Sequence, residues 1–135
     1  MDAKELMITD LVMCRKIQEK YARVTEIYLT LDENPKRMVS LDADGARYCM
    51  RIESIEPIPL TAEILVKNGF EKNGSHFIIY NDYYSILVFE LSDSIWQLQY
   101  TDIEMGNSNA QMNFSSVHEL QHAMRFLGID KRIVL

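Results

Sequence analysis

Two histidines and a glutamate in the last fifth of the chain have the spacing of a zinc-hydrolase helix. His118, Glu119 and His122 fit the pattern H-E-x-x-H, in which histidines four residues apart share one helix face and can bind zinc. The glutamate between them would then polarise a zinc-bound water. The pattern allows one candidate function, that of a small zinc-dependent hydrolase.

The residues around this pattern do not complete a catalytic zinc site. Zincins usually take a third protein ligand downstream, and neither His nor Glu follows His122. The longer pattern H-E-x-x-H-x-x-G-x-x-H also fails, because Arg125 and Gly128 occupy its glycine and third-histidine positions. Ser116 and Glu119 fit a capping box, which would engage the glutamate at the helix start. We therefore expect a structural helix, no catalytic, cofactor-binding or metal-binding residue, and no cofactor. The alternative is that His76 or an upstream carboxylate completes a metal site in space.

The helical periodicity predicts which side of this helix is buried. At about 100° per residue, an apolar stripe forms from Val117, Leu120, Met124 and Leu127. The two histidines fall on the opposite side, together with Gln121 and Arg125. We expect that side to face solvent.

Other chemical motifs are missing from the sequence. Each glycine stands alone, so there is no Gly-rich phosphate loop, and no serine lies in a nucleophile elbow. Cys14 and Cys49 are the only cysteines, and they do not form a C-x-x-C pair. Both have strand-like neighbours, which predicts two buried free thiols instead of a disulfide.

The elements that would position these residues begin with short strands in the first half. Alternation of apolar and polar residues predicts strands over Leu6–Cys14, Val24–Leu31, Met38–Leu41 and Arg47–Ile52. In the second of these, Ile27, Leu29 and Leu31 should share the inner face. Asp42–Gly45 has the composition of a tight hairpin turn. Together these segments predict a small antiparallel sheet or partial barrel over residues 6 to 56.

Helical and strand signals alternate in the second half. Pro57 and Pro59 predict an extended connector. After it come a helix from the Thr61 N-cap to Gly69, three antiparallel strands, and a helix from Ser116 to Leu127; the strands are Ser75–Tyr80, Tyr83–Leu91 and Ile95–Glu104. The sequence therefore predicts an α+β protein. We expect a single domain over residues 1–135, with subregions 6–56 and 60–135 sharing one core.

Composition and charge limit the class of protein. The 135 residues are 47% hydrophobic and 25% charged, with a net charge of −6, as in an ordinary globular domain. There is no apolar run of membrane-span length and no secretory signal, so we expect a cytoplasmic protein without a membrane partner. No Lys or Arg lies between Lys72 and Arg125, whereas basic residues gather in the first half: Arg15, Lys16, Lys20, Arg23, Lys36, Arg37, Arg47 and Arg51. Acids are interleaved with these, which argues against nucleic-acid binding.

Two blocks of the sequence resemble a known family. They are Ile-Glu-Pro-Ile-Pro-Leu-Thr-Ala-Glu-Ile-Leu-Val-Lys-Asn-Gly-Phe at 55–70 and Val-His-Glu-Leu-Gln-His-Ala-Met-Arg-Phe-Leu-Gly-Ile at 117–129. They are similar to blocks in small uncharacterised proteins of bacterial genomes, prophages and mobile elements. The opening segment 6–12 is also similar to the family's Leu-x-Ile-Gly-Asn-x-Val, with Thr9 at the glycine position. The resemblance implies no activity, and similar sequences often read His-x-Leu-Gln-Asn in the final helix, which implies an accidental zincin match.

The sequence leaves three functional hypotheses. We expect a non-enzymatic accessory or adaptor protein of prophage or mobile-element origin that works through protein contacts. This expectation rests on the missing catalytic motifs and on the acidic, aromatic-rich second half. The first alternative is a zinc hydrolase that uses His118, Glu119 and His122, and the second is nucleic-acid binding by the N-terminal strands. The partner and the oligomeric state do not follow from the sequence.

Overall fold

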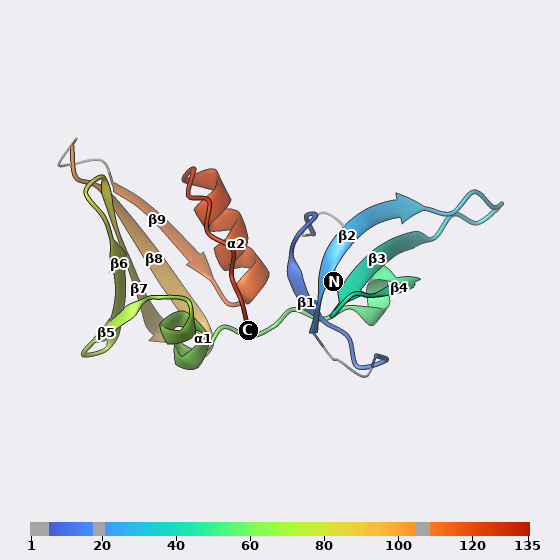
Figure 1. Cartoon of the computed structure of the whole chain (residues 1–135), viewed down its shortest axis with the longest axis horizontal. Helices are drawn as coiled ribbons and strands as arrows, with labels where there is room; N and C mark the ends of the chain where they lie inside the picture. The colour runs from blue at the N-terminus through green and yellow to red at the C-terminus, as the bar shows by residue number, and fades with distance from the viewer. Residues whose placement is uncertain (1–5, 18–20, 105–108) are drawn as a thin grey trace. The chain divides into compact units, whose positions relative to one another are not determined.

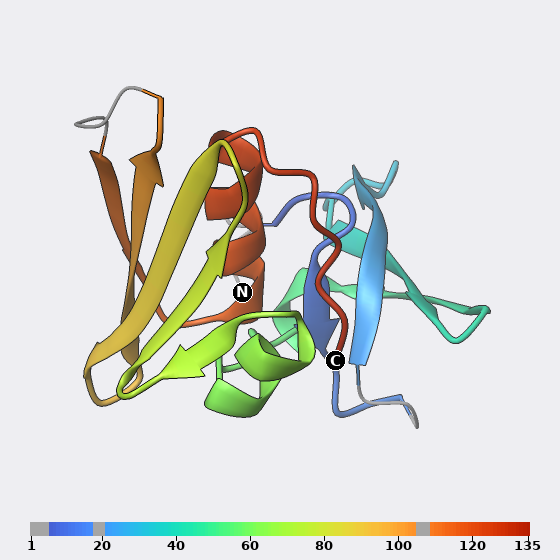
Figure 2. The same cartoon turned by 60° about the vertical axis from the view of Figure 1, so that its left-hand side comes forward.

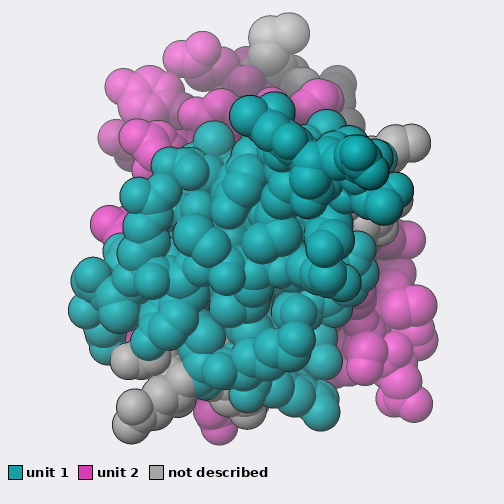
Figure 3. Space-filling view, turned by 90° about the vertical axis from the view of Figure 1, so that its right-hand side faces the viewer, with its two compact units in different colours: residues 1–58 teal, residues 59–135 magenta. Residues whose placement is uncertain are grey.

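The computed structural model describes residues 6–17, 21–104 and 109–135. Its chain divides after Ile58 into two units, residues 1–58 and 59–135 (Figure 3). The boundary falls between Pro57 and Pro59, where an extended connector is predicted. Two antiparallel sheets and two α-helices confirm the α+β class. The expectation of a core shared by the whole chain stays a prediction.

The first unit is a four-stranded antiparallel sheet in which each strand pairs with its neighbour in the chain (Figure 1). Its elements are β1 (Leu11–Met13), β2 (Tyr21–Leu29), β3 (Arg37–Ala43), β4 (Ala46–Arg51) and the short 3-10 helix η2 (Ile52–Ser54). Beyond η2, the backbone of Glu56 exchanges two hydrogen bonds with Met13 of β1, at 2.9 and 2.8 Å. The segment after β4 therefore returns to β1, which agrees with the expected partial barrel.

The inner face of this sheet forms the core of the first unit. Val24, Val39 and Leu41 are fully buried there with Cys14. The prediction that Leu29 and Leu31 lie inside with Ile27 is wrong, because both leucines are exposed. A register shift between Val24 and Glu26 breaks the alternation of β2, and the β2–β3 hairpin then extends past the packed part of the unit (Figure 1).

The segment before β1 is a tight turn, so the predicted strand over residues 6–14 is wrong except at Leu11–Met13. The buried carboxylate of Asp10 accepts a hydrogen bond from the Met7 backbone N–H at 2.7 Å. Thr9 has a φ of 76°, a left-handed conformation that costs a non-glycine residue about 1–2 kcal/mol. Glycine at this position would adopt the same backbone without that cost.

The hairpin between β3 and β4 confirms the predicted turn. Asp44 and Gly45 have φ values of 51° and 83°, as a two-residue type I′ turn requires. The Asp42 carboxylate accepts a hydrogen bond from the Gly45 backbone N–H at 3.0 Å. This turn fixes the register that brings Ser40 opposite Cys49.

The second unit is a five-stranded antiparallel sheet with a helix along one face (Figures 1 and 2). Its elements are α1 (Ala62–Lys67), β5 (Glu71–Asn73), β6 (His76–Tyr80), β7 (Tyr84–Ser92), β8 (Ile95–Asp102), β9 (Asn109–Phe114) and α2 (Val117–Phe126). The three predicted strands correspond to β6, β7 and β8. Trp96 and Leu98 on β8 are buried and alternate with the half-buried Gln97 and Gln99, so the first two residues mark the inner face of that strand.

Two strands of this sheet were not predicted. β5 contains only Glu71, Lys72 and Asn73, which are all exposed, so no apolar alternation marks it. β9 does carry a signal, since Ala110, Met112 and Phe114 alternate with polar residues. That alternation is the mark of a half-buried strand and could have identified β9.

Both helices end as the sequence predicts. The Thr61 hydroxyl accepts a hydrogen bond from the Ile64 N–H at 3.3 Å, which confirms the N-cap of α1. Gly69 and Gly128 follow the two C-caps with φ values of 89° and 75°. In each case the next residue donates back to the helix, from Phe70 to Leu65 and from Ile129 to Met124, which is the Schellman arrangement.

The last residues of the chain are fixed to α1 by one buried amide. Asn68 Nδ2 donates to the carbonyl oxygens of Ile64 (2.8 Å) and Val134 (2.7 Å). Asn68 Oδ1 accepts from the Val134 N–H at 2.8 Å. Next to this clamp, Ile133 is fully buried, so the segment after α2 is part of the packed unit.

Candidate functional site

The H-E-x-x-H residues lie on α2, but the predicted solvent-facing side is wrong. His118 is only 3% exposed, and Gln121 is buried as well. His122 is half-buried, with its ring centroid 5.5 Å from that of His118. Of the predicted stripe, Val117, Leu120 and Met124 are buried, and Leu127 is only half-buried. The buried face of α2 is therefore wider than the stripe and includes the first histidine.

The predicted capping box is wrong in its bonding, although Ser116 does occupy the N-cap position. The Ser116 side chain makes no bond to the helix backbone. Its Oγ instead lies 2.8 Å from Glu119 Oε1 and 2.9 Å from His118 Nδ1. An ionised carboxylate only accepts hydrogen bonds, so the serine hydroxyl donates to Glu119 and accepts from a protonated His118 Nδ1. Two of the three candidate zinc-site side chains, His118 and Glu119, thus have a structural partner at the helix start.

No third metal ligand is brought to this helix within the described part of the chain. Among residues 6–17, 21–104 and 109–135, no three His, Cys, Asp or Glu side chains form a group that could hold a metal ion. The remaining histidine, His76, lies on β6 and packs edge-on against Phe89 with ring centroids 5.2 Å apart. At the start of α2, the side chains of Ser116, His118 and Glu119 form a hydrogen-bonded cluster.

Replacing His118 with alanine should lower the free energy of unfolding by about 1–3 kcal/mol, because Ser116 loses a buried hydrogen-bond donor. The expected loss for His122→Ala is smaller, since this side chain is only half-buried. His118→Asn retains an N–H donor near the Nδ1 position and should recover part of the loss. Urea denaturation measures the free energy of unfolding of all three variants. Elemental analysis of untagged protein should find no stoichiometric zinc, and one equivalent of zinc lost in both alanine variants would contradict this account.

A basic cleft in the first unit is the feature that the sequence did not predict. Its volume is about 820 Å³, and it is lined by Arg15, Lys16, Pro35, Lys36, Arg37, Arg51, Glu53, Ser54 and Glu56. Arg37 begins β3 and Arg51 ends β4, so antiparallel pairing places them at the same end of the sheet. The bridge from Met13 to Glu56 brings the segment after β1 to that end.

The charge of this cleft is mostly positive. Three arginines and two lysines line it, against two glutamates. Arg15 Nε lies 3.2 Å from a carboxylate oxygen of Glu56; the arginine is largely exposed and the glutamate is half-buried. No described residue forms an ion pair with Lys16, Lys36 or Arg51. The cleft therefore has positive charge available for an anionic ligand.

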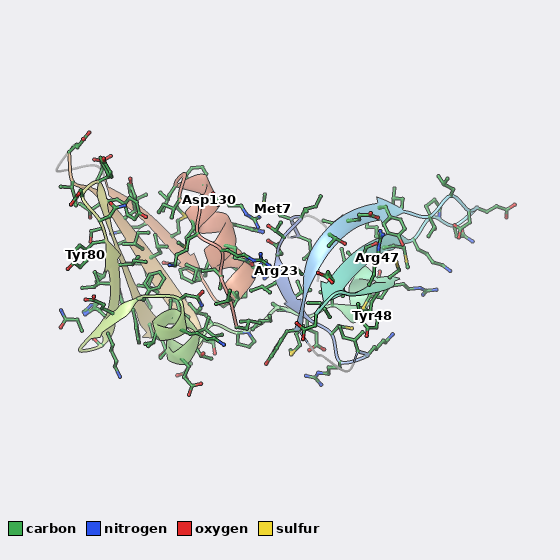
Figure 4. The ribbon with its side chains drawn as sticks, in the orientation of Figure 1. Met7, Arg23, Arg47, Tyr48, Tyr80 and Asp130 are labelled. Carbon is green, nitrogen blue, oxygen red and sulfur yellow. The ribbon has the colours of Figure 1, made fainter. Side chains whose placement is uncertain are left out.

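The other basic residues of the first half lie elsewhere. Arg47 on β4 (Figure 4) lies 2.7 Å from Glu26 Oε1. Arg23 donates to the Thr9 carbonyl oxygen at 3.2 Å, and Lys20 is outside the described residues. The interleaved acids concealed the cleft in the sequence. Glu26 lies outside the cleft because β2 pairs with β3 and places it opposite Ser40.

Cys14 is buried as predicted, but the prediction of a buried Cys49 is wrong. Cys49 lies on the outer face of β4, where its Sγ is 3.5 Å from Ser40 Oγ. Hydrogen bonds from Ser40 and Tyr28 lower the pKa of the Cys49 thiol, and the positive charge of Arg47 lowers it further. Partial desolvation and Glu26 oppose this shift. Cys49 is consequently an exposed thiol with an increased thiolate fraction at neutral pH.

Alkylation by iodoacetamide should modify Cys49 faster at pH 7 than it modifies a free cysteine, because the thiolate is the nucleophile. The pH at which the rate is half-maximal should lie below the ordinary cysteine value, since the folded-state pKa is lowered. Ser40→Ala removes the largest stabilising hydrogen bond and should move that pH upward. Buried Cys14 is the internal control, because it should react only after unfolding. An unchanged pH profile in Ser40→Ala would show that this hydrogen bond does not set the thiol pKa.

Comparisons with known proteins identify no relative of this chain. No protein-family model, curated protein or solved structure matches the chain. Within the described residues, no helix is long and apolar enough to cross a membrane.

Proposed function

We propose that the chain is a non-enzymatic binding module whose N-terminal unit binds nucleic acid through the basic cleft. One observation carries this proposal: five Lys and Arg side chains from separate stretches of sequence converge on one cleft of about 820 Å³. The proposal places the protein in the cytoplasm, as the sequence predicts. It also retains the origin among small bacterial and prophage proteins, which rests on the two sequence blocks.

Phosphate is the anion that best suits the side chains of the cleft. Arg15, Arg37 and Arg51 each offer a planar guanidinium, which binds phosphate oxygens in a bidentate manner. The nearby lysines add positive charge without that geometric demand. The chain as a whole has a net charge of −6, so we expect a polyanion to bind where positive side chains gather, as they do in this cleft.

The two carboxylates of the cleft favour nucleic acid over an acidic protein segment. Glu53 and Glu56 would repel the carboxylates of an acidic peptide and the phosphates of a nucleic acid alike. A nucleic-acid strand presents phosphates with hydroxyl and amino donors between them, so both signs of charge in the cleft find complementary groups. The ligand expected from this pattern is a phosphate-bearing chain with polar donors.

Fluorescence anisotropy with labelled 12-nucleotide single strands tests this proposal. Wild-type protein should bind with an affinity that falls as salt rises, with a slope near −2 on logarithmic axes for about three phosphate contacts. Replacing both Arg37 and Arg51 with alanine should weaken binding at least tenfold. The control Arg47→Ala removes a basic residue outside the cleft and should change affinity less than twofold.

Two results would count against nucleic acid as the ligand. The first is no salt-dependent binding by wild-type protein, and the second is an equal loss in Arg47→Ala. A poly-glutamate peptide tests the other class of polyanion. Tight binding of that peptide, without binding of the oligonucleotides, would assign the cleft to an acidic protein partner.

A protein partner with a basic segment is a second candidate, favoured by one end of the second unit. Tyr80 (Figure 4), Tyr83 and Ile103 are each at least half exposed there. The Ile103 N–H donates to the Tyr83 carbonyl at 3.0 Å, so these two residues are neighbours. Asp82 and Asp102 lie beside them in the chain, and no Lys or Arg occurs between Lys72 and Arg125.

An oligo-lysine peptide probes this second surface. Wild-type protein should bind the peptide, and Tyr83→Ala combined with Ile103→Ala should weaken binding several-fold. Cleft variants should leave this affinity unchanged. Equal binding by the double variant would exclude the apolar pair as a contact and leave only diffuse charge attraction.

A further inference from the structure

The two carboxylates of the basic cleft, Glu53 and Glu56, restrict which hydrogen-bond donors its ligand must carry. Glu56 already pairs with Arg15, at 3.2 Å. Glu53 lies in η2 and is exposed on the cleft wall. No described residue forms a hydrogen bond or ion pair with its side chain. Glu53 is thus the carboxylate of the cleft lining that has no described ion-pair partner and that a ligand can reach.

A carboxylate beside bound phosphates is unfavourable unless it accepts a hydrogen bond from the ligand. Like charges at short range repel, and an ionised glutamate can only accept. Nucleotides offer two kinds of donor, the hydroxyl groups of the sugar and the amino groups of the bases. Either donor would turn Glu53 from a repulsive group into a specific contact.

The size of the cleft restricts the form of the nucleic acid. Its volume of about 820 Å³ falls in the range of about 300–1,000 Å³ that accommodates a drug-sized ligand. One or two nucleotides have that size, whereas a double helix does not enter such a cleft. Base amino groups in a duplex offer only the one N–H that faces a groove, whereas in a single strand the whole Watson–Crick edge is accessible.

We infer that the cleft holds about two nucleotides of a single strand, with phosphates at Arg37 and Arg51 and a sugar hydroxyl or base amino group donating to Glu53. This inference rests on the proposed function and narrows it to single-stranded nucleic acid. Glu53 is then a specificity-determining residue, and the basic side chains supply most of the affinity.

Glu53→Gln should change the affinity for single strands in opposite directions, depending on whether Glu53 only repels phosphates or accepts a hydrogen bond from the ligand. If Glu53 only repels phosphates, removing its charge should tighten binding of single strands. If it accepts a ligand hydrogen bond, the loss of the charged acceptor should weaken binding about fivefold. Glu33→Gln is the matched control, because Glu33 is exposed, carries the same charge and lies outside the cleft lining. It should leave binding unchanged or make it slightly tighter.

Anisotropy with four labelled strands identifies the donor. Ribose and deoxyribose 12-mers of one sequence are compared, and adenine and thymine homopolymers form the second pair. A Glu53→Gln loss confined to the ribose strand assigns the sugar hydroxyl, and a loss confined to the amino-bearing bases assigns the base. Both outcomes support the inference.

Other outcomes overturn the inference and remain distinguishable from a failure of the proposed function. Tighter or unchanged binding by Glu53→Gln, or equal affinity for a 12-base-pair duplex, would overturn the inference while nucleic-acid binding stands. A wild-type protein that binds none of the strands would overturn both.

Discussion

Replacing Trp96 with alanine should lower the free energy of unfolding by about 3–5 kcal/mol, the range for loss of a buried aromatic ring. Trp96 is 5% exposed, and its ring centroid lies 6.0 Å from that of Phe77. It pairs across strands with Glu90 and Phe114, so β-strands flank it on both sides. A cavity between β7 and β9 cannot close without moving the sheet, so we expect the full loss of unfolding free energy.

Urea denaturation followed by far-UV circular dichroism measures this loss, because Trp96 is the only tryptophan and its removal abolishes the fluorescence signal. Phe126→Ala is the control: this aromatic residue of α2 is 81% exposed and should change stability by about 0.5 kcal/mol or less. Wild-type fluorescence should be blue-shifted and protected from iodide. An emission maximum like that of tryptophan in water would contradict the burial of the ring.

Asn68→Ala should cost about 1–3 kcal/mol, because it leaves buried backbone groups without their partners. The Asn68 amide makes three hydrogen bonds, two of them to the backbone of Val134. Their loss should release the segment that buries Ile133. Asn68→Asp should be at least as damaging, since a carboxylate cannot donate to the two carbonyl oxygens.

Lys67→Ala is the matched control for this clamp. Lys67 Nζ hydrogen-bonds the Leu135 carbonyl, so it contacts the same C-terminal segment, but the lysine is exposed. Its removal should cost about 0.5 kcal/mol or less. Amide hydrogen exchange should show faster exchange at Ile133 and Val134 in Asn68→Ala only. Equal protection in both variants would mean that apolar packing, and not the amide, holds the segment.

Local signals in the sequence predict the local features of this fold. The Thr61 cap, the Gly69 and Gly128 helix ends and the Asp44–Gly45 turn each depend on a few neighbouring residues, and all of them are present. Strand alternation succeeds on β8 for the same reason. It fails on β2, because a register shift after Val24 depends on the partner strand.

The side-chain environment on α2 could not be read from periodicity. Helical spacing locates the centre of the buried face, but its width depends on what packs against the helix. His118 is buried because the covering surface extends past the apolar stripe. Ser116 and Glu119 fit a capping box by type, yet their hydroxyl and carboxylate bond to each other. The residue types thus predicted that Ser116 and Glu119 interact, but which atoms form the hydrogen bond depends on the three-dimensional structure.

The basic cleft was beyond local inference because its residues are distant in sequence. Arg15, Arg37 and Arg51 meet only after β1, β2, β3 and β4 have paired. In the sequence, the same residues are mixed with acids and have the pattern of solvated surface. The sheet register separates these basic residues from the acids beside them in the sequence, and composition does not predict that register.

The strand order of both sheets has a consequence for how the chain acquires its structure. Strands pair in the order of the chain, as β1-β2-β3-β4 and β5-β6-β7-β8-β9. Each hairpin therefore closes a short loop, and predominantly local contacts favour rapid folding. The bridges from Met13 to Glu56 and from Pro59 to Ser116 span far more residues and should form last in each unit. Since the first of them needs nothing beyond Ile58, we expect the four strands of the first unit to pair on the ribosome while the remaining strands are still being translated.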